Sequence, residues 1–211
     1  MWKDLFRPSV ISDRAHRLAE PVGRLVAKTG IHPNAVTITG FLLIIGVAWL
    51  LAEGWFLLGG ILVLVISCSD FIDGALARAT GKATTFGALL DSSLDRYSEA
   101  VLLFGLLWFH ASAGAFTEVM LIFATLVGSL LVSYVRARAE GLGLFAEVGI
   151  MRRTLRVITL AVGLMLSPIQ PALLVILWIL AVATNLTALY RLFYVWRASR
   201  RTEVRLRQEG E

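Results

Sequence analysis

The chain has 211 residues, of which 57% are apolar, and a formal net charge of +5. Soluble domains are typically about 45–50% apolar, so this composition and a mean hydropathy of +0.76 argue against a soluble globular protein. The length suits a single domain over residues 1–211, and the single cysteine, Cys68, excludes an intrachain disulfide.

The first predicted element is an amphipathic helix within residues 1–30. Residues 9–29 alternate apolar side chains with four basic ones. A helix that spans a bilayer needs about 20 mostly apolar residues, so this segment carries too much charge to span. We expect it to lie in the membrane interface with its basic side toward the headgroups. An ordinary solvated helix is the alternative.

Six apolar segments follow, and they predict a bundle of transmembrane helices over residues 31–196. The predicted spans are residues 35–52, 55–77, 86–108, 116–135, 155–166 and 171–196. The fifth is short for a bilayer, and it would begin earlier if Arg152, Arg153 and Arg156 face a wet cavity instead of lipid. The predicted fold class is therefore an all-α integral membrane protein with six transmembrane helices after an interfacial N-terminal helix.

The basic residues alternate with the spans. All but two lie in every second connection or at an end of the chain, in residues 1–30, 78–85, 136–156 and 197–211. The exceptions, Arg96 and Arg191, lie inside predicted spans. The positive-inside rule then predicts a protein of the cell membrane with both termini in the cytoplasm, including a basic tail of residues 197–211. Basic residues that face anionic headgroups also account for the pI of about 9.9 without a nucleic-acid partner.

The most informative segment runs from residue 70 to residue 95 and carries four aspartates, Asp70, Asp73, Asp91 and Asp95. The first two stand three residues apart and the last two stand four apart, so each pair shares one face of its helix. The link between the two helices contains Gly81 and lies on the cytoplasmic side. A helical hairpin can direct these faces at each other, which gathers four carboxylates near one membrane surface.

Four carboxylates at membrane depth are too costly to be passive. A single charged side chain at the bilayer centre costs about 2.5–3.5 kcal/mol on insertion scales. Like charges close together also repel one another unless a cation neutralises them. Carboxylate oxygens suit Mg²⁺ or Mn²⁺, whereas zinc prefers nitrogen and sulfur ligands. The sequence therefore predicts a divalent-cation site.

Small residues and one arginine accompany the acids. Gly74, Ala77 and Gly87 remove side-chain bulk, which allows helices to pack closely or a ligand to lie against the backbone. Arg78 can pair with a phosphate through its planar guanidinium. Plain helix packing is the alternative explanation for Gly74 and Gly87.

Together these residues form one ungapped pattern, D-x-x-D-G-x-x-A-R, eight residues, G-x-x-x-D-x-x-x-D. The pattern resembles the signature of the CDP-alcohol phosphotransferases, and an interfacial helix followed by six spans resembles that family as well. The resemblance implies an enzyme that transfers a phosphatidyl-type group from a CDP-linked lipid to a small alcohol. It also implies a homodimer.

The resemblance assigns a role to each motif residue. Two divalent metals, Mg²⁺ or Mn²⁺, would be held by Asp70, Asp73, Asp91 and, in part, Asp95. Asp95 would also be the general base. The CDP site would be bounded by Gly74, Ala77, Arg78 and Gly87. The segment HPNAVTI resembles the family's entry to the first span, where Asn34 and Thr37 would reach the nucleotide.

The second half of the chain bears on the acceptor. The segments SYVRARAEGLG and GIMRRTLRV, together with Arg191, resemble the corresponding parts of bacterial phosphatidylinositol-phosphate synthases. Arg136, Arg153 and Arg191 would then form a cationic pocket for the phosphate of a phosphorylated polyol. Ordinary cytoplasmic positive charge is the alternative for Arg136.

One segment departs from that pattern. Residues 152–156 are Arg-Arg-Thr-Leu-Arg, where the inositol-phosphate enzymes usually carry Glu-Arg-Pro-Glu-Arg. The glycerol-phosphate branch often shows Lys-Thr-x-x-Gln nearby, which Arg153 and Thr154 resemble, although Val157 replaces the glutamine. We expect CDP-diacylglycerol as donor and an inositol phosphate as acceptor, with sn-glycerol 3-phosphate second. A divalent-cation transporter is the remaining alternative, and it is disfavoured because the acids lie near one membrane face.

Overall fold

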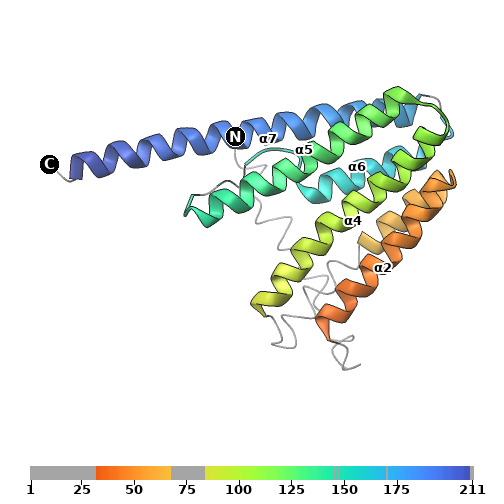
Figure 1. The fold of residues 1–211 in the computed structure, drawn as a ribbon, viewed down its shortest axis with the longest axis horizontal. Coiled ribbons are helices and arrows are strands. Elements are labelled where there is room, and N and C mark those ends of the chain that lie inside the picture. The colour runs from red at the N-terminus through yellow and green to blue at the C-terminus, as the bar shows by residue number, and fades with distance from the viewer. Residues whose placement is uncertain (1–31, 68–83, 145, 147, 170, 210–211) are drawn as a thin grey trace, which may run out of the picture. The chain divides into compact units, whose positions relative to one another are not determined.

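The computed structural model describes residues 32–67 and 84–209, apart from residues 145, 147 and 170. Within these ranges the chain is helical and contains no strand, which confirms the predicted all-α class. The helices are α2 (Pro33–Ala52), the helix Phe56–Ser67, α4 (Thr85–Ser112), α5 (Phe116–Gly141), α6 (Arg153–Met165) and α7 (Ala172–Glu209) (Figure 1). The predicted interfacial helix within residues 1–30 lies outside the described residues, as do residues 68–83.

Three of the helices end on the same glycine arrangement. After α2, α4 and α5, the residues Gly54, Gly114 and Gly143 have φ values of 83°, 70° and 72°. At the end of α4, for example, the Gly114 N–H donates to Ala111 O at 3.1 Å and the next N–H donates to His110 O at 2.9 Å. This Schellman arrangement satisfies carbonyls that a helix end leaves without partners. Glycine therefore sets a sharply defined end for each of these three helices.

The helix bounds agree with the predicted spans to within two residues in α2 and in α6. The main difference is α7. The predicted sixth span ends at residue 196 and a tail follows, whereas α7 continues as one helix to Glu209. No glycine or proline interrupts residues 172–209, and arginine, glutamine and glutamate are good helix formers. Residues 197–209 of the predicted basic tail are therefore a helical extension of α7.

Among the residues that the structure describes, three helices are long and apolar enough to cross a membrane, namely Pro33–Ala52, Phe116–Gly141 and Ala172–Arg200. The apolar helix Phe56–Ser67 stops where a described range ends. Helix α4 has 28 residues, but its first half carries several charged side chains, and α6 has only 13 residues. These helices agree with an integral membrane protein, although the described residues do not establish the number six.

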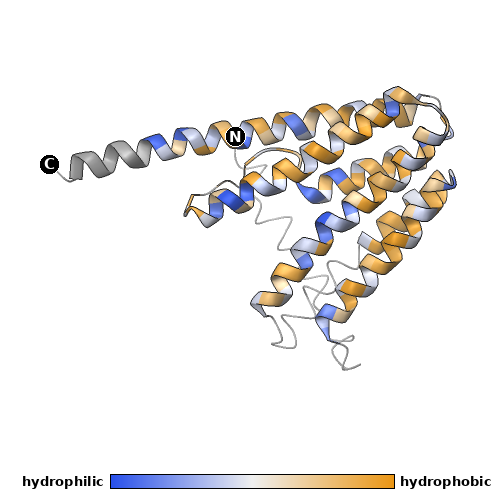
Figure 2. Cartoon of the chain, viewed as in Figure 1, coloured by the Kyte–Doolittle hydropathy of each residue, from blue (hydrophilic) through white to orange (hydrophobic). Residues whose placement is uncertain are grey.

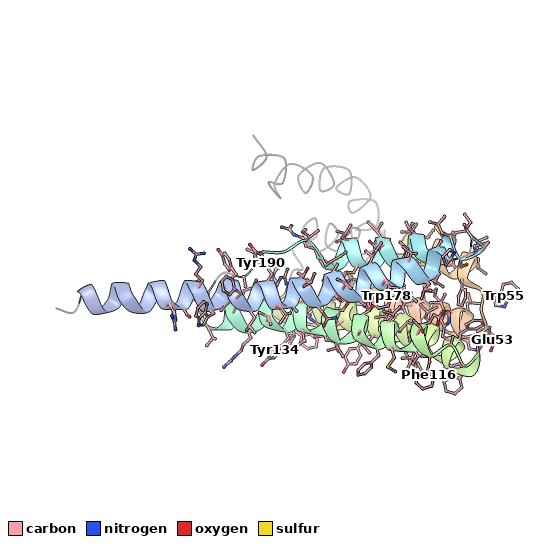
Figure 3. The ribbon with its side chains drawn as sticks, turned by 90° about the horizontal axis from the view of Figure 1, so that it is seen from above. Glu53, Trp55, Phe116, Tyr134, Trp178 and Tyr190 are labelled. Carbon is pink, nitrogen blue, oxygen red and sulfur yellow. The ribbon has the colours of Figure 1, made fainter. Side chains whose placement is uncertain are left out.

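Hydrophobic residues predominate along much of the helices (Figure 2), and many of the large ones are exposed. Trp49, Phe104 and Leu189 are 65%, 60% and 62% exposed. A soluble protein rarely exposes large continuous apolar surfaces, whereas lipid chains cover such surfaces in a bilayer. Figure 3 shows Tyr134 toward the C-terminal end of α5 with Tyr190 of α7 at a similar level, and Trp55 toward the opposite end of α5. This separation is typical of aromatic side chains at the two membrane interfaces.

The chain folds as two compact units, one of residues 1–47 and 62–101 and the other of residues 48–61 and 102–211. In the second unit, α5 and α7 lie side by side (Figures 1 and 3). A Cβ atom on Gly128 of α5 would overlap Oγ1 of Thr184 on α7. Asn185 Nδ2 donates across the same contact to Ala124 O at 2.9 Å. Small residues that allow close approach and polar side chains that bond between helices are the usual means of packing in a membrane.

Candidate active site

Helix α4 carries the second half of the aspartate motif, and Thr84 fixes where this helix begins. Thr84 Oγ1 accepts a hydrogen bond from the Gly87 N–H at 2.9 Å. A threonine that caps the N–H of the third helical residue is a preferred helix start. With the start fixed, Asp91 and Asp95 stand four residues apart on one face of α4. Both side chains are partly exposed.

The first unit brings two predicted nucleotide-binding residues together. A Cβ atom on Gly87 would lie 3.0 Å from Asn34 Oδ1, so the glycine leaves room for the Asn34 side chain beside the start of α4. Phe41 of α2 and Tyr97 of α4 pack edge to face with ring centroids 6.4 Å apart. Asn34 and Gly87 thus form one wall on the face of α4 that carries the aspartates.

The start of α2 positions Asn34 and Thr37. Pro33 is the first helical residue, a position where the missing N–H of proline loses no helical bond. His32 Nδ1 accepts a hydrogen bond from the Asn34 N–H at 3.3 Å. Thr37 Oγ1 donates to Pro33 O at 3.3 Å, so this contact of the hydroxyl is within its own helix.

Of the four predicted metal ligands, Asp91 and Asp95 are described, and Asp70 and Asp73 lie outside the described residues. The predicted CDP-site residues Gly74, Ala77 and Arg78 lie outside them as well. Among the residues that are described, no group of three or more His, Cys, Asp or Glu side chains could hold a metal ion. Two carboxylates are part of an oxygen donor set that fits Mg²⁺ or Mn²⁺. Asp91 and Asp95 therefore fit the predicted site as half of its ligands.

Glu99 is an acidic residue that the sequence analysis did not single out. It follows Asp95 by four residues, so Asp91, Asp95 and Glu99 form one acidic line along α4. Glu99 is only 7% exposed, in contrast to the partly exposed Asp91 and Asp95. Its spacing from the motif was the available signal, because an acid inside an apolar span is rarely without a role.

In the second unit, Arg191 is a buried link between three segments of the chain. It is 3% exposed. Its Nε donates to Val148 O at 2.7 Å and its Nη1 donates to Val132 O at 2.7 Å. Arg191 on α7 thus bonds both to α5 and to the connection between α5 and α6. The sequence predicted a phosphate ligand at this position, and the structure adds this role in holding the backbone.

The other arginines of the second unit differ in exposure. Arg136 has a side chain that is 43% exposed, and its Nε lies 2.8 Å from Glu140 Oε1 in an ion pair one helical turn away. Arg153 is the first residue of α6. Arg156 is 3% exposed and donates from Nη1 to Met151 O at 3.0 Å. The sequence counted Arg156 among the cytoplasmic charges, or as a residue facing a wet cavity, and did not predict that it binds a backbone carbonyl inside the protein.

Comparison with known proteins extends these observations. The family model for CDP-alcohol phosphatidyltransferase matches residues 30–189. The phosphatidylinositol phosphate synthase of Mycobacterium tuberculosis is 37% identical over 189 residues, which cover 85% of this chain and 86% of that protein. The archaetidylinositol phosphate synthase of Pyrococcus horikoshii is 35% identical over 198 residues, which cover 93% of this chain and 98% of that protein.

Solved structures give the same result. A crystal structure of the Mycobacterium tuberculosis phosphatidylinositol phosphate synthase with CDP-DAG bound matches with a TM-score of 0.78 and 36% identity, over 85% of this chain and 94% of that one. A second crystal structure of that enzyme, in complex with manganese and citrate, matches with a TM-score of 0.77 and 35% identity, over 84% and 88% of the two chains.

The family match runs from residue 30 to residue 189 and therefore includes the whole aspartate motif and the start of α2. It confirms the resemblance that the motif indicated and removes the ground for the transporter alternative. The chain belongs to the CDP-alcohol phosphatidyltransferase family, and it is a transferase enzyme embedded in the membrane.

Proposed function

We propose that this enzyme transfers the phosphatidyl group of CDP-diacylglycerol to a hydroxyl of an inositol phosphate and releases CMP. One observation carries the choice of acceptor. The two relatives described above differ in the lipid part of their names, phosphatidyl and archaetidyl, but share inositol phosphate. The element common to both names is the acceptor, and the matches cover 85% and 93% of this chain.

Asp95 is the general base of the proposed reaction. Its carboxylate takes the proton of the acceptor hydroxyl, and the oxygen of that hydroxyl then forms a bond to the phosphorus that bears diacylglycerol. The bond from that phosphorus to the oxygen of the CMP phosphate breaks, and CMP leaves with the bonding electrons. The partly exposed position of Asp95 on α4 suits a group that must reach substrate. No covalent intermediate with the protein is needed.

Asp70, Asp73 and Asp91, with Asp95 sharing in part, are the residues that would hold two divalent cations, Mg²⁺ or Mn²⁺. Bound cations of this kind polarise a pyrophosphate and stabilise negative charge on a leaving phosphate. The same four aspartates also need positive charge beside them at membrane depth, because uncompensated carboxylates repel one another.

The nucleotide would lie against the wall formed by Asn34 and Gly87. Gly87 has no side chain to occupy the space beside Asn34. A Cβ atom on Gly87 would lie 3.0 Å from Asn34 Oδ1. The same role in bounding the CDP site belongs to Thr37, Gly74, Ala77 and Arg78. In this group Arg78 supplies the charged donor for phosphate oxygens.

The acceptor phosphate would be bound by Arg136, Arg153 and Arg191. Arg191 fits a pre-organised phosphate ligand because its two carbonyl contacts hold the guanidinium in one orientation. A guanidinium has five N–H donors, so these two bonds leave it capable of further ones. Arg136 would exchange its exposed ion pair with Glu140 for the substrate, which costs little because exposed pairs contribute about 0–1 kcal/mol.

The test is release of CMP by the purified enzyme in the presence of CDP-diacylglycerol and Mg²⁺ or Mn²⁺. Inositol phosphate, sn-glycerol 3-phosphate, free inositol and serine are compared as acceptors. Asp95→Asn should lower kcat by about 10²–10⁴-fold, the usual contribution of a general base, while CDP binding is retained. Tyr97→Phe, on the opposite face of α4 and 63% exposed, is the matched control and should leave the rate unchanged.

The second candidate acceptor, sn-glycerol 3-phosphate, is favoured by the missing acids in residues 152–156. Release of CMP with glycerol phosphate alone would replace inositol phosphate as acceptor and leave the rest of the mechanism intact. Turnover with free inositol as fast as with its phosphate would contradict the cationic pocket. A folded protein that neither binds CDP nor releases CMP would contradict the proposed reaction.

We also propose that the aspartates and both termini face the cytoplasm and that the enzyme is a homodimer. The orientation is testable at the two ends of α5 in a Cys68→Ser background. Ala113→Cys and Arg138→Cys introduce thiols at exposed positions before and near the end of that helix. In intact cells a membrane-impermeant maleimide should label residue 113 and spare residue 138. The reverse labelling would contradict the orientation, and a monomeric mass in detergent would contradict the dimer.

A further inference from the structure

Residues 148–152, named here the α5–α6 strap, cross beside α7 before α6 begins (Figure 1). Two buried arginines from different helices hold its carbonyl groups. Arg191 Nε donates to Val148 O at 2.7 Å, and Arg156 Nη1 donates to Met151 O at 3.0 Å. Backbone carbonyls that are buried away from water need hydrogen-bond partners within the protein. The strap is therefore a fixed element of the second unit.

Gly149 makes the closest contact between the strap and α7. Its φ is +98°, and a Cβ atom there would lie 2.6 Å from Thr187 Cγ2 and 3.8 Å from Arg191 Nε. Thr187 and Arg191 stand one turn apart on the same face of α7. The strap thus lies with bare backbone against Thr187, and this contact lets the Val148 carbonyl reach Arg191.

The end of the strap leads directly into the predicted acceptor pocket. Arg152 precedes α6 and its N–H donates to Ile150 O at 2.8 Å, and Arg153 is the first residue of that helix. A shift of the strap away from α7 would move Arg153 and would also remove one of the two bonds that orient Arg191. Two of the three arginines assigned to the acceptor phosphate therefore depend on where the strap lies.

We infer that Gly149 is a positioning residue for the acceptor: its contact with Thr187 seats the strap on α7 and so sets Arg153 and Arg191 for the acceptor's phosphate group. The inference rests on the proposed function, because it takes the phosphorylated acceptor from there. Gly149 itself touches no substrate. Its effect is expected on binding of the acceptor and not on binding of the CDP-linked donor.

The main test is Gly149→Ala in the full-length enzyme, with KM measured separately for the acceptor and for CDP-diacylglycerol. The new Cβ pushes the strap off Thr187, and we expect the acceptor KM to rise about tenfold, as for a misplaced hydrogen bond to a charged group. The KM for CDP-diacylglycerol should not change. A purely structural role would instead lower the amount of folded enzyme and leave both KM values as they are.

Two glycines of the same region serve as matched controls. Gly143 also has a positive φ, +72°, but a Cβ there meets nothing within 4 Å, and Gly141 in α5 has neither the unusual φ nor a neighbour within 4 Å. Gly143→Ala reproduces the backbone strain without the contact with α7. Both controls should keep the acceptor KM of the unaltered enzyme. A rise in Gly143→Ala as large as in Gly149→Ala would overturn the inference.

Rescue gives an independent result. Thr187→Ser removes Cγ2, and the nearest remaining Thr187 atom is Cβ at 3.7 Å, so Gly149→Ala combined with Thr187→Ser should regain most of the acceptor affinity. If Gly149→Ala alone does not fold, Thr187→Leu presses on Gly149 from the α7 side and should raise the acceptor KM in the same way. Unchanged acceptor KM in Gly149→Ala, or in Thr187→Leu, would overturn the inference.

The failure of the inference is distinct from the failure of the proposed function. If the unaltered enzyme releases no CMP with any phosphorylated acceptor, the proposed function is wrong and the inference falls with it. If the unaltered enzyme turns over a phosphorylated acceptor but the Gly149 variants keep its KM, only the positioning role is wrong.

Discussion

Replacement of Arg191 by methionine removes the link between α7, α5 and the α5–α6 strap. Methionine is also long and unbranched, so packing changes little while both donors are lost. Each hydrogen bond from a charged group contributes about 1.5–3 kcal/mol, which sets roughly 3–6 kcal/mol as an upper limit for the two bonds at 2.7 Å. The guanidinium also loses its own desolvation penalty, which offsets part of this.

The two carbonyls differ in what they lose. Val132 lies inside α5, where its carbonyl also accepts the regular helical bond, so it keeps a donor. Val148 lies in the strap, and the loss of Arg191 Nε leaves its carbonyl short of a donor, at about 1–3 kcal/mol for a buried group. We therefore expect Arg191→Met to lower the free energy of unfolding by about 2–3 kcal/mol.

The assay is thermal unfolding of the purified enzyme in one detergent. About 2–4 °C per kcal/mol is typical for chains of this size, so the expected fall in Tm is about 4–12 °C. The Tm of Arg191→Lys should lie between those of the unaltered enzyme and Arg191→Met, because a single ammonium replaces a planar guanidinium that donates to two carbonyls. Arg200→Met is the matched control on the same helix, where Arg200 lies over the exposed Trp196 ring at 4.5 Å. A fall in Tm no larger than that of the control would refute the stabilising role of the two Arg191 hydrogen bonds.

Three further results are expected. Removal of divalent cations by EDTA should abolish CMP release, and Mg²⁺ or Mn²⁺ should restore it, because the aspartate oxygens form a hard-ligand site; activity that survives EDTA would contradict the metal site. Gly128→Ala should lower the free energy of unfolding by about 1–3 kcal/mol through overlap with Thr184, while Gly46→Ala, with nothing within 4 Å, should not; equal Tm values for the two would contradict the close contact of α5 and α7. Glu99→Gln should lower the free energy of unfolding by roughly 1–3 kcal/mol, and with it the Tm, since it alters a buried carboxylate that takes part in a polar interaction; an unchanged Tm would show that its charge is dispensable.

The sequence predicted the class of fold and most helix bounds because both follow from local properties. The length of each apolar run sets a span, and glycines such as Gly54 and Gly114 mark where helices end. The end of α7 was missed for a related reason. Charge was taken as the end of a membrane span, which is reasonable, but a helix ends only where its backbone bonds stop, and residues 197–209 contain no residue that stops them.

The aspartate motif was predictable because its spacing is itself the signal, and the same rule extends to Glu99 one turn farther along α4. The spacing could not predict how deeply each acidic side chain is buried in the protein. Asp95 and Glu99 differ in exposure although both are acids on one face, and that difference depends on which segments pack beside each turn.

Arg191 stood out in the sequence because it lies inside an apolar span, but the carbonyl contacts of Arg156 and Arg191 were not predicted, because charge counting gives the position of an arginine and not its partners. The irregular backbone of the strap offers a physical reason for the burial of both arginines. The strap leaves the helical pattern at Val148 and Met151, so those carbonyls have no regular helical donor and accept from Arg191 and Arg156 instead. An arginine supplies several donors in a fixed plane and is never neutralised. In this chain the same side chain can therefore complete the backbone bonds of an irregular segment and present positive charge to a phosphate. A Tm that falls in Arg191→Met together with a raised acceptor KM would show both roles in one residue, whereas a fall in Tm alone would leave phosphate binding to Arg136 and Arg153.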